Sequence, residues 1–228
     1  YSVTDANSCT AVTGNINVTQ PTAISVSSAA VSSPILCNGG TGTVKITATG
    51  GTAPLSYTFN GVTNATGTFT GVSAGNNLSY SVTDANSCTA VTGNINVTQP
   101  TAISVSSAAV SSPILCNGGT GTVKITATGG TAPLSYTFNG VTNATGTFTG
   151  VSAGNNLSYS VTDANSCTAV TGNINVTQPT AISVSSAAVS SPILCNGGTG
   201  TVKITATGGT APLSYTFNGV TNATGTFT

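Results

Sequence analysis

A perfect internal repeat is the feature that most constrains the fold of this chain. The segment YSVTDANSC begins at Tyr1, Tyr80 and Tyr159, a spacing of 79 residues, and corresponding positions never differ. The 228 residues therefore hold slightly less than three periods and begin within one of them. This period is longer than the roughly 20–50 residues of a solenoid repeat and suits a small independent domain. We therefore expect a tandem array of identical domains, and we interpret the chain as a segment cut from a longer array.

Composition and periodicity indicate that each domain consists of β-strands. One period, residues 1–79, contains 15 Thr, 10 Ser, 8 Val and 8 Asn, a composition that favours strands and turns over helices. Apolar side chains alternate with polar ones in several short runs separated by turn signals such as Asn60-Gly61. Periodic apolar residues and zero net charge argue against disorder. We predict an all-β fold, in which tandem Ig-like antiparallel β-sandwich domains form a linear array.

Three Gln-Pro dipeptides mark candidate domain boundaries. Each follows the run NINVT and precedes a new strand pattern. Proline removes a backbone donor and restricts the residue before it, so a strand should stop there. The predicted division gives two whole sandwich domains, residues 21–99 and 100–178. It leaves a partial repeat of C-terminal strands at 1–20 and one of N-terminal strands at 179–228.

The charged side chains are too few for most chemistry. The chain has 3 basic residues, 3 acidic residues and no histidine. General acid–base catalysis usually depends on histidine or on a pair of carboxylates, and nucleic-acid binding depends on clustered Lys and Arg. No apolar run is long enough to span a membrane. We therefore expect no enzymatic activity, no cofactor, no metal site, no nucleic-acid partner and no membrane insertion in this segment.

The few charged residues have simple structural interpretations. Asp84 lies in the sequence T-D-A-N-S, where Asp typically accepts backbone N–H bonds in an Asx-type turn. Calcium is the alternative, but it requires six to eight oxygen ligands. Lys45 falls on the polar face of its predicted strand and is expected to be solvated. The aromatic residues expected in the core of the first whole domain are Tyr57, Phe59, Phe69 and Tyr80.

Two cysteines in each period predict a disulfide. Two periodic schemes are possible, either Cys37 with Cys88 inside one domain or Cys9 with Cys37 across a boundary. The predicted domain phase favours the first scheme, which gives the pairs Cys37–Cys88 and Cys116–Cys167. Such a bond would indicate an oxidising, extracellular location. Two cysteines without a nearby histidine are too few ligands for tetrahedral zinc.

The ordered motifs of one period resemble a known family. They are ILCNGGTGTVKI at 35–46, GGTAPLSYTFNG at 50–61, GVSAGNNLSYSVTDANSC at 71–88 and VTQP at 97–100. Together they are similar to the SprB-type repeat of cell-surface adhesins in gliding Bacteroidota, and the resemblance covers essentially the whole period. It implies a long, secreted cell-surface protein that is exported by the type IX system and built largely of tandem β-sandwich domains. It implies no catalytic residues.

These observations favour a structural role. We expect a stalk or fibre segment of a repetitive adhesin, which supports surface attachment or gliding. The expected partners are neighbouring identical repeats, which touch at the Gln-Pro junctions, and possible lateral neighbours in a fibre. The alternative is that the Thr-, Ser- and Asn-rich faces themselves bind polysaccharide or ice.

Overall fold

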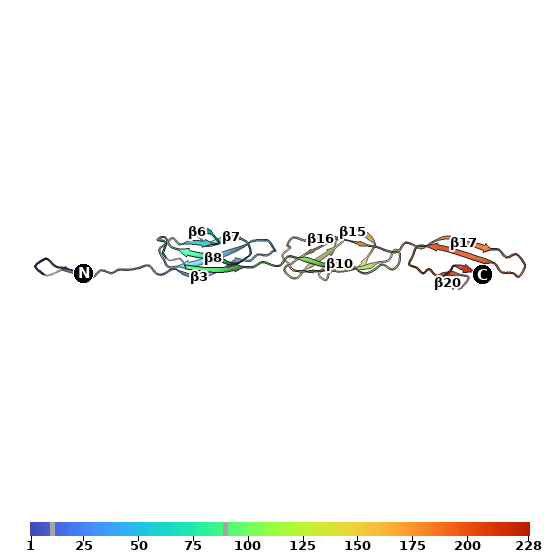
Figure 1. The fold of residues 1–228 in the computed structure, drawn as a ribbon, viewed down its shortest axis with the longest axis horizontal. Helices are drawn as coiled ribbons and strands as arrows, with labels where there is room; N and C mark the ends of the chain where they lie inside the picture. The colour runs from blue at the N-terminus through green and yellow to red at the C-terminus, as the bar shows by residue number, and fades with distance from the viewer. Residues whose placement is uncertain (10–11, 89–90) are drawn as a thin grey trace. The chain divides into compact units, whose positions relative to one another are not determined.

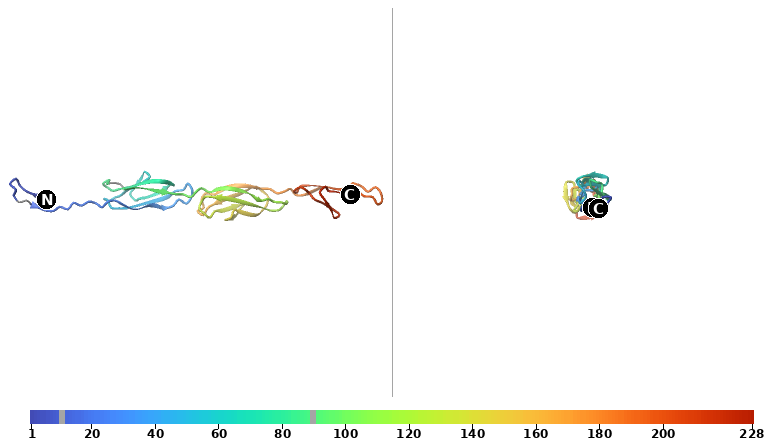
Figure 2. Two further views of the ribbon diagram at one scale, coloured as in Figure 1. Left: turned by 60° about the horizontal axis from the view of Figure 1, so that its bottom comes forward. Right: turned by 90° about the vertical axis from the view of Figure 1, so that its left-hand side faces the viewer.

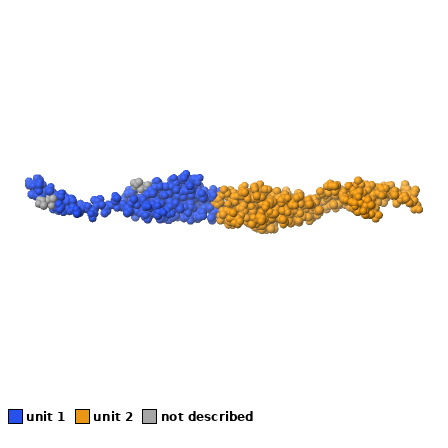
Figure 3. Space-filling model, turned by 90° about the horizontal axis from the view of Figure 1, so that it is seen from below, with its two compact units in different colours: residues 1–99 blue, residues 100–228 orange. Residues whose placement is uncertain are grey.

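The computed structural model describes residues 1–9, 12–88 and 91–228. Within these residues every regular element is a β-strand, so the all-β prediction is confirmed. The chain divides into two compact units, Tyr1–Gln99 and Pro100–Thr228, which Figure 3 distinguishes by colour. The division falls at one of the three Gln-Pro dipeptides.

The first unit contains a short hairpin followed by a seven-stranded sandwich. The hairpin pairs β1 (Ser2–Val3) with β2 (Val12–Thr13). The sandwich strands then follow in chain order (Figure 1). They are β3 (Ser25–Ser33), β4 (Gly42–Thr49), β5 (Ser56–Phe59), β6 (Val62–Asn64), β7 (Thr68–Val72), β8 (Gly75–Thr83) and β9 (Val91–Val97).

The strand order is that of an Ig-like fold. One sheet has the order β3-β4-β7 and the other has the order β6-β5-β8-β9. All of the pairings are antiparallel. The chain crosses between the sheets after β4, after β6 and after β7, which gives the interleaved connectivity of immunoglobulin-type sandwiches.

The second unit repeats this sandwich. Its sheets have the orders β10-β11-β14 and β13-β12-β15-β16, with the same antiparallel registers. Figure 2 shows the ribbon from two further directions. The strands are β10 (Ser104–Ser112), β11 (Gly121–Thr128), β12 (Ser135–Phe138), β13 (Val141–Asn143), β14 (Thr147–Val151), β15 (Gly154–Thr162) and β16 (Val170–Val176).

Residues 179–228 form the first strands of a further sandwich, with an open core. Ile193 is 61% exposed, although its counterparts Ile35 and Ile114 in the complete sandwiches are each only 4% exposed. The difference arises because these residues contain no counterparts of β8 and β9 to cover the apolar face. The strands are β17 (Ser183–Ser191), β18 (Thr201–Thr207), β19 (Tyr215–Phe217), β20 (Val220–Asn222) and β21 (Thr226–Phe227).

The core of each complete sandwich lies between its two sheets. In β4, buried residues alternate with more exposed ones, as the two-residue period predicts. Phe59 and Phe69 come from opposite sheets, and their ring centroids lie 5.4 Å apart. Tyr57, Phe59 and Phe69 are buried and Tyr80 packs against them, so the predicted aromatic core is confirmed.

The Asn60-Gly61 turn sets the register of the hairpin between β5 and β6. Both residues have positive φ, 45° and 83°, as a type I′ turn requires. Phe59 then pairs directly with Val62 across the two-residue loop. The predicted hairpin is therefore confirmed.

Candidate functional site

Within the part of the chain that the structure describes, the titratable groups do not gather into a reactive site. Among the described residues, no group of three or more His, Cys, Asp or Glu side chains could hold a metal ion. The same residues include no helix long and apolar enough to cross a membrane. The features that remain are the two ends of each sandwich, a groove between its sheets and one polar sheet face.

Asp84 organises the end of the sandwich where the chain begins the domain. Its Oδ1 accepts the backbone N–H groups of Asn86 and Cys88 at 3.0 and 2.9 Å, and its Oδ2 accepts that of Thr52 at 2.9 Å. The predicted Asx-type turn is present. Asp84 as a whole residue is 5% exposed, and both of its carboxylate oxygens accept hydrogen bonds from backbone N–H groups. Asp163 has the same contacts in the second sandwich.

These hydrogen bonds lower the pKa of Asp84. The bond from the Cys88 N–H has the largest effect and the bond from the Thr52 N–H the next largest, whereas burial acts in the opposite direction. A carboxyl whose folded pKa is depressed stabilises the fold above its unfolded pKa, about 3.9, and that contribution is lost as the pH falls through the folded value. Because the chain has no His or Glu, we expect stability to be flat between about pH 5 and 8 and to fall below about pH 4.

Urea unfolding across this pH range measures the effect. The double variant Asp84→Asn with Asp163→Asn should be less stable at pH 7, because the amide NH₂ replaces one carboxylate acceptor opposite the Thr52 and Thr131 N–H groups. Its free energy of unfolding should also change much less as the pH falls below about 4. A variant whose free energy of unfolding falls as steeply with decreasing pH as that of the unmodified chain would contradict this assignment.

Gln99 organises the opposite end of the sandwich, where the chain leaves the domain. Its side-chain Oε1 accepts the backbone N–H of Gly39 at 2.8 Å, in the loop between β3 and β4. Gln178 repeats this bond with Gly118 in the second unit, where Asn117 Nδ2 also donates to the Pro179 carbonyl at 3.0 Å. The loop that carries the first cysteine of each domain therefore lies against the departing chain.

The predicted within-domain disulfides are not present. Cys37 and Cys167 are disulfide-bonded, but Cys88 and Cys116 are free thiols, so the pairs Cys37–Cys88 and Cys116–Cys167 do not form. Cys9 is free as well, which also removes the alternative Cys9–Cys37 pair.

The geometry of one sandwich explains this correction. The Cys37 loop precedes β4, whereas the Cys88 loop is tied through Asp84 to Thr52, just beyond the end of β4. β4 has 8 residues, and at about 3.3 Å per residue it separates the two loops by roughly 25 Å. A disulfide needs Cα atoms within about 7 Å.

Lys45 is held more firmly than predicted. It does lie on the outer face of β4, but its Nζ donates to the Thr66 carbonyl and to Thr68 Oγ1, both at 2.8 Å. The reason is the strand pairing, which places Thr68 of β7 directly opposite Lys45. Lys124 and Lys203 make the same pair of bonds, so these lysines connect a strand to the neighbouring turn and are not freely solvated.

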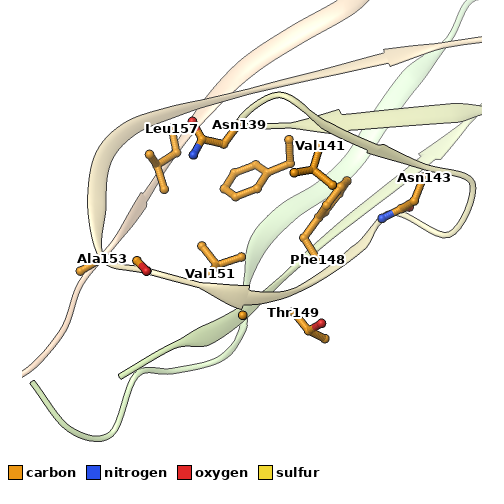
Figure 4. A pocket seen from close by; sticks show the side chains of 11 residues that line it. Asn139, Val141, Asn143, Phe148, Thr149, Val151, Ala153 and Leu157 are labelled. Atoms are coloured by element: carbon orange, nitrogen blue, oxygen red, sulfur yellow. The ribbon is translucent and has the colours of Figure 1, made fainter. Parts of the chain in front are cut away.

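An open groove lies between the edge strands of the two sheets. In the second unit its volume is about 410 Å³, and Figure 4 shows apolar side chains facing it from both sheets. The lining carries no charged side chain. Asn143 is committed to its own turn, because its Oδ1 accepts the Thr145 and Gly146 N–H groups. The apolar residues of the groove are Phe138, Val141, Phe148, Val151, Ala153 and Leu157.

The outer face of the four-stranded sheet has the opposite character. A shallow hollow of about 260 Å³ is formed there largely by hydroxyl and amide side chains. Tyr80 pairs with Gly93 across the β8–β9 ladder, and its ring occupies the space that a side chain at Gly93 would need. The polar residues of the hollow are Thr58, Ser79, Ser81, Thr92 and Asn94.

The structural role of Gln99 was not predicted from the sequence, in which only the proline that follows it gave a boundary signal. The functional part is the amide, which caps a loop 60 positions away. A contact at that sequence distance leaves no local pattern, so the sequence carried no signal for it.

The family model described as "SprB repeat" matches residues 29–64, 108–143 and 187–222. No curated protein matches the chain.

Two solved structures are similar to the chain at low identity. One is the three N-terminal domains of the bacteriophage RB49 Highly Immunogenic Outer Capsid protein (Hoc), at 17% identity and TM-score 0.40, covering 82% of this chain and 69% of that one. The other is Sidekick-1 immunoglobulin domains 1-5, at 14% identity and TM-score 0.37, covering 84% of this chain and 46% of that one.

Proposed function

Because this chain carries three tandem SprB repeats, we propose that it is a stalk segment of a long, secreted cell-surface adhesin that supports surface attachment or gliding. In this proposal the repeats are spacers, and the binding tip lies elsewhere in the protein. The bonded cysteines favour an extracellular location.

The position of the two chain ends in one sandwich carries the proposal. Near the start of the domain, the Thr22 carbonyl accepts the Gly51 N–H at 2.7 Å, beyond one end of β4. Where the chain leaves the domain, Gln99 contacts the loop that leads into the first residue of β4, at the opposite end of that strand. The chain therefore begins and ends each domain at opposite ends of the sandwich, so each domain separates its own two attachment points by about one domain length, roughly 30–40 Å for a compact domain of this size.

The remaining surface chemistry supports a spacer. The outer faces carry hydroxyls and amides, and each period has a single lysine and a single aspartate. With so few charges, domain stability and reach should depend little on ionic strength. No step of catalysis is required of any described residue.

Binding of polysaccharide through the repeats themselves is the second candidate. The observation in its favour is the polar hollow of Thr58, Ser79, Ser81, Thr92 and Asn94, which supplies hydroxyl and amide partners for a neutral sugar. The aromatic rings of Phe59 and Phe69 are buried in the core and offer no exposed stacking platform. This candidate therefore rests on hydrogen bonding alone.

Deletion of one repeat separates the two functions. Because the copies are identical, removing residues 80–158 joins two repeats without changing any junction sequence. We expect the hydrodynamic length to fall by one domain increment and the binding of the protein to soluble neutral polysaccharide to be absent in both forms. Saturable polysaccharide binding that weakens in step with the number of repeats would overturn the spacer proposal in favour of the second candidate.

A further inference from the structure

Each repeat contains two Asn-Gly dipeptides. In the second sandwich one of them, Asn139-Gly140, forms the hairpin turn between β12 and β13. The other, Asn117-Gly118, lies in the loop between β10 and β11. All four residues are exposed. The hairpin site and the loop site therefore have the same sequence and similar access to water.

An Asn-Gly dipeptide can react with itself. Asparagine is a thermolabile residue, and a glycine after it has no side chain to shield the next peptide nitrogen. Once that nitrogen has given its proton to hydroxide, it attacks the asparagine Cγ. The N–Cγ bond forms, the Cγ–Nδ2 bond breaks, and ammonia leaves with a proton taken from water, which gives a five-membered succinimide. Water then opens this ring to aspartate or isoaspartate, so the net change is loss of ammonia and gain of water.

Hydrogen bonds hold both reacting groups of the loop site. The Gly118 N–H, whose nitrogen would attack, donates to Gln178 Oε1 at 2.8 Å. The Asn117 Nδ2, which would leave as ammonia, donates to the Pro179 carbonyl at 3.0 Å. The ring can close only after the first of these bonds breaks and the amide turns away from its own partner.

The first sandwich has the same protection at its attacking nitrogen. There Gln99 Oε1 accepts the Gly39 N–H at 2.8 Å. Breaking one such hydrogen bond before the reaction should slow it by about two- to tenfold.

The reacting groups of the hairpin site are not held in this way. Asn139 donates its backbone N–H to the Ser158 carbonyl at 2.9 Å, which leaves its side chain uninvolved. In the part of the chain that the structure describes, no hydrogen bond holds the Asn139 side-chain amide or the Gly140 N–H. A Cβ added to Gly140 meets no atom within 4 Å, so the space beside this glycine is open.

We propose that the hairpin asparagine of each repeat is a site of spontaneous deamidation, and that the glutamine at the end of each sandwich protects the identical dipeptide in the loop. Each reaction gives one negative charge to a repeat whose single lysine and single aspartate otherwise balance. Asn139 lines the groove shown in Figure 4, so the new carboxylate lies at the edge of an otherwise uncharged lining. The array therefore gains negative charge with age, at the groove and not at the capped loop.

Tryptic fragments report the two kinds of site separately. Cleavage after the three lysines gives fragment 1–45, whose Asn-Gly dipeptide is the loop site at Asn38. The two 79-residue fragments carry the hairpin sites of both sandwiches, Asn60 and Asn139, at the same position. The folded 228-residue chain is incubated in mildly alkaline buffer, then reduced and digested, and tandem mass spectrometry locates each deamidated asparagine.

We expect the hairpin sites to convert about two- to tenfold faster than Asn38 in the folded chain. In urea, where neither site is held, the two kinds of site should convert equally. Equal conversion in the folded chain would overturn the proposal. A difference that persists in urea would also overturn it, because the sequence and not the fold would then set the rates.

Two variants of Gln99 test the protecting bond directly. Gln99→Ala removes the acceptor and should raise the conversion of Asn38 to nearly that of the hairpin sites, which should themselves be unchanged. Gln99→Glu keeps an oxygen opposite the Gly39 N–H and should retain the protection. Unchanged conversion of Asn38 in Gln99→Ala, or an equal rise in both variants, would overturn the protective role of this glutamine.

Discussion

Replacement of Gly67 by alanine should strongly destabilise the first sandwich. Gly67 has φ +66°, and a Cβ there would lie 2.2 Å from the Ile46 carbonyl oxygen and 3.1 Å from the Tyr57 ring. The Gly67 carbonyl also accepts the Ile46 N–H at 2.8 Å, so neither backbone can move away freely. Left-handed strain of about 1–2 kcal/mol and steric overlap of about 1–3 kcal/mol together give a loss of about 2–5 kcal/mol.

Gly61→Ala is the matched control, because Gly61 also has positive φ but a Cβ there meets no atom within 4 Å. It should cost only the backbone strain, about 1–2 kcal/mol. Calorimetry in reductant measures the loss of stability in each variant. The second sandwich, which retains Gly146, is unmodified and is an internal reference. Gly67→Ala should split the thermal transition in two, at about 4–8 °C for each kcal/mol lost. Equal shifts for the two variants would show that the predicted overlap with Ile46 does not form.

Local patterns predicted the features that depend on neighbouring residues. The Asn60-Gly61 turn needs only two residues able to adopt positive φ, and the Asp84 turn needs only the backbone donors that follow it. Both appear as expected. The same applies to Tyr57 and Phe59, whose alternation with polar residues places them on the core face of β5.

Features that join distant segments were predicted less well. The position of Lys45 on the outer face was correct, but its bonds to Thr66 and Thr68 depend on which strand pairs with β4. The Gln99 cap on Gly39 depends on where β9 ends relative to the β3–β4 loop. The cysteine pairing was wrong for the same reason, since membership of one domain does not imply proximity.

The repeat, the strands and the near absence of charge are properties of the sequence itself, because side-chain alternation and turn chemistry act over only a few residues. The direction in which each strand runs between the two ends of the sandwich was decided by tertiary structure alone. That direction places Cys37 and Cys88 a strand length apart and brings the Cys37 loop to Gln99. Strand order depends on packing two sheets around one core, a long-range condition that no local pattern encodes.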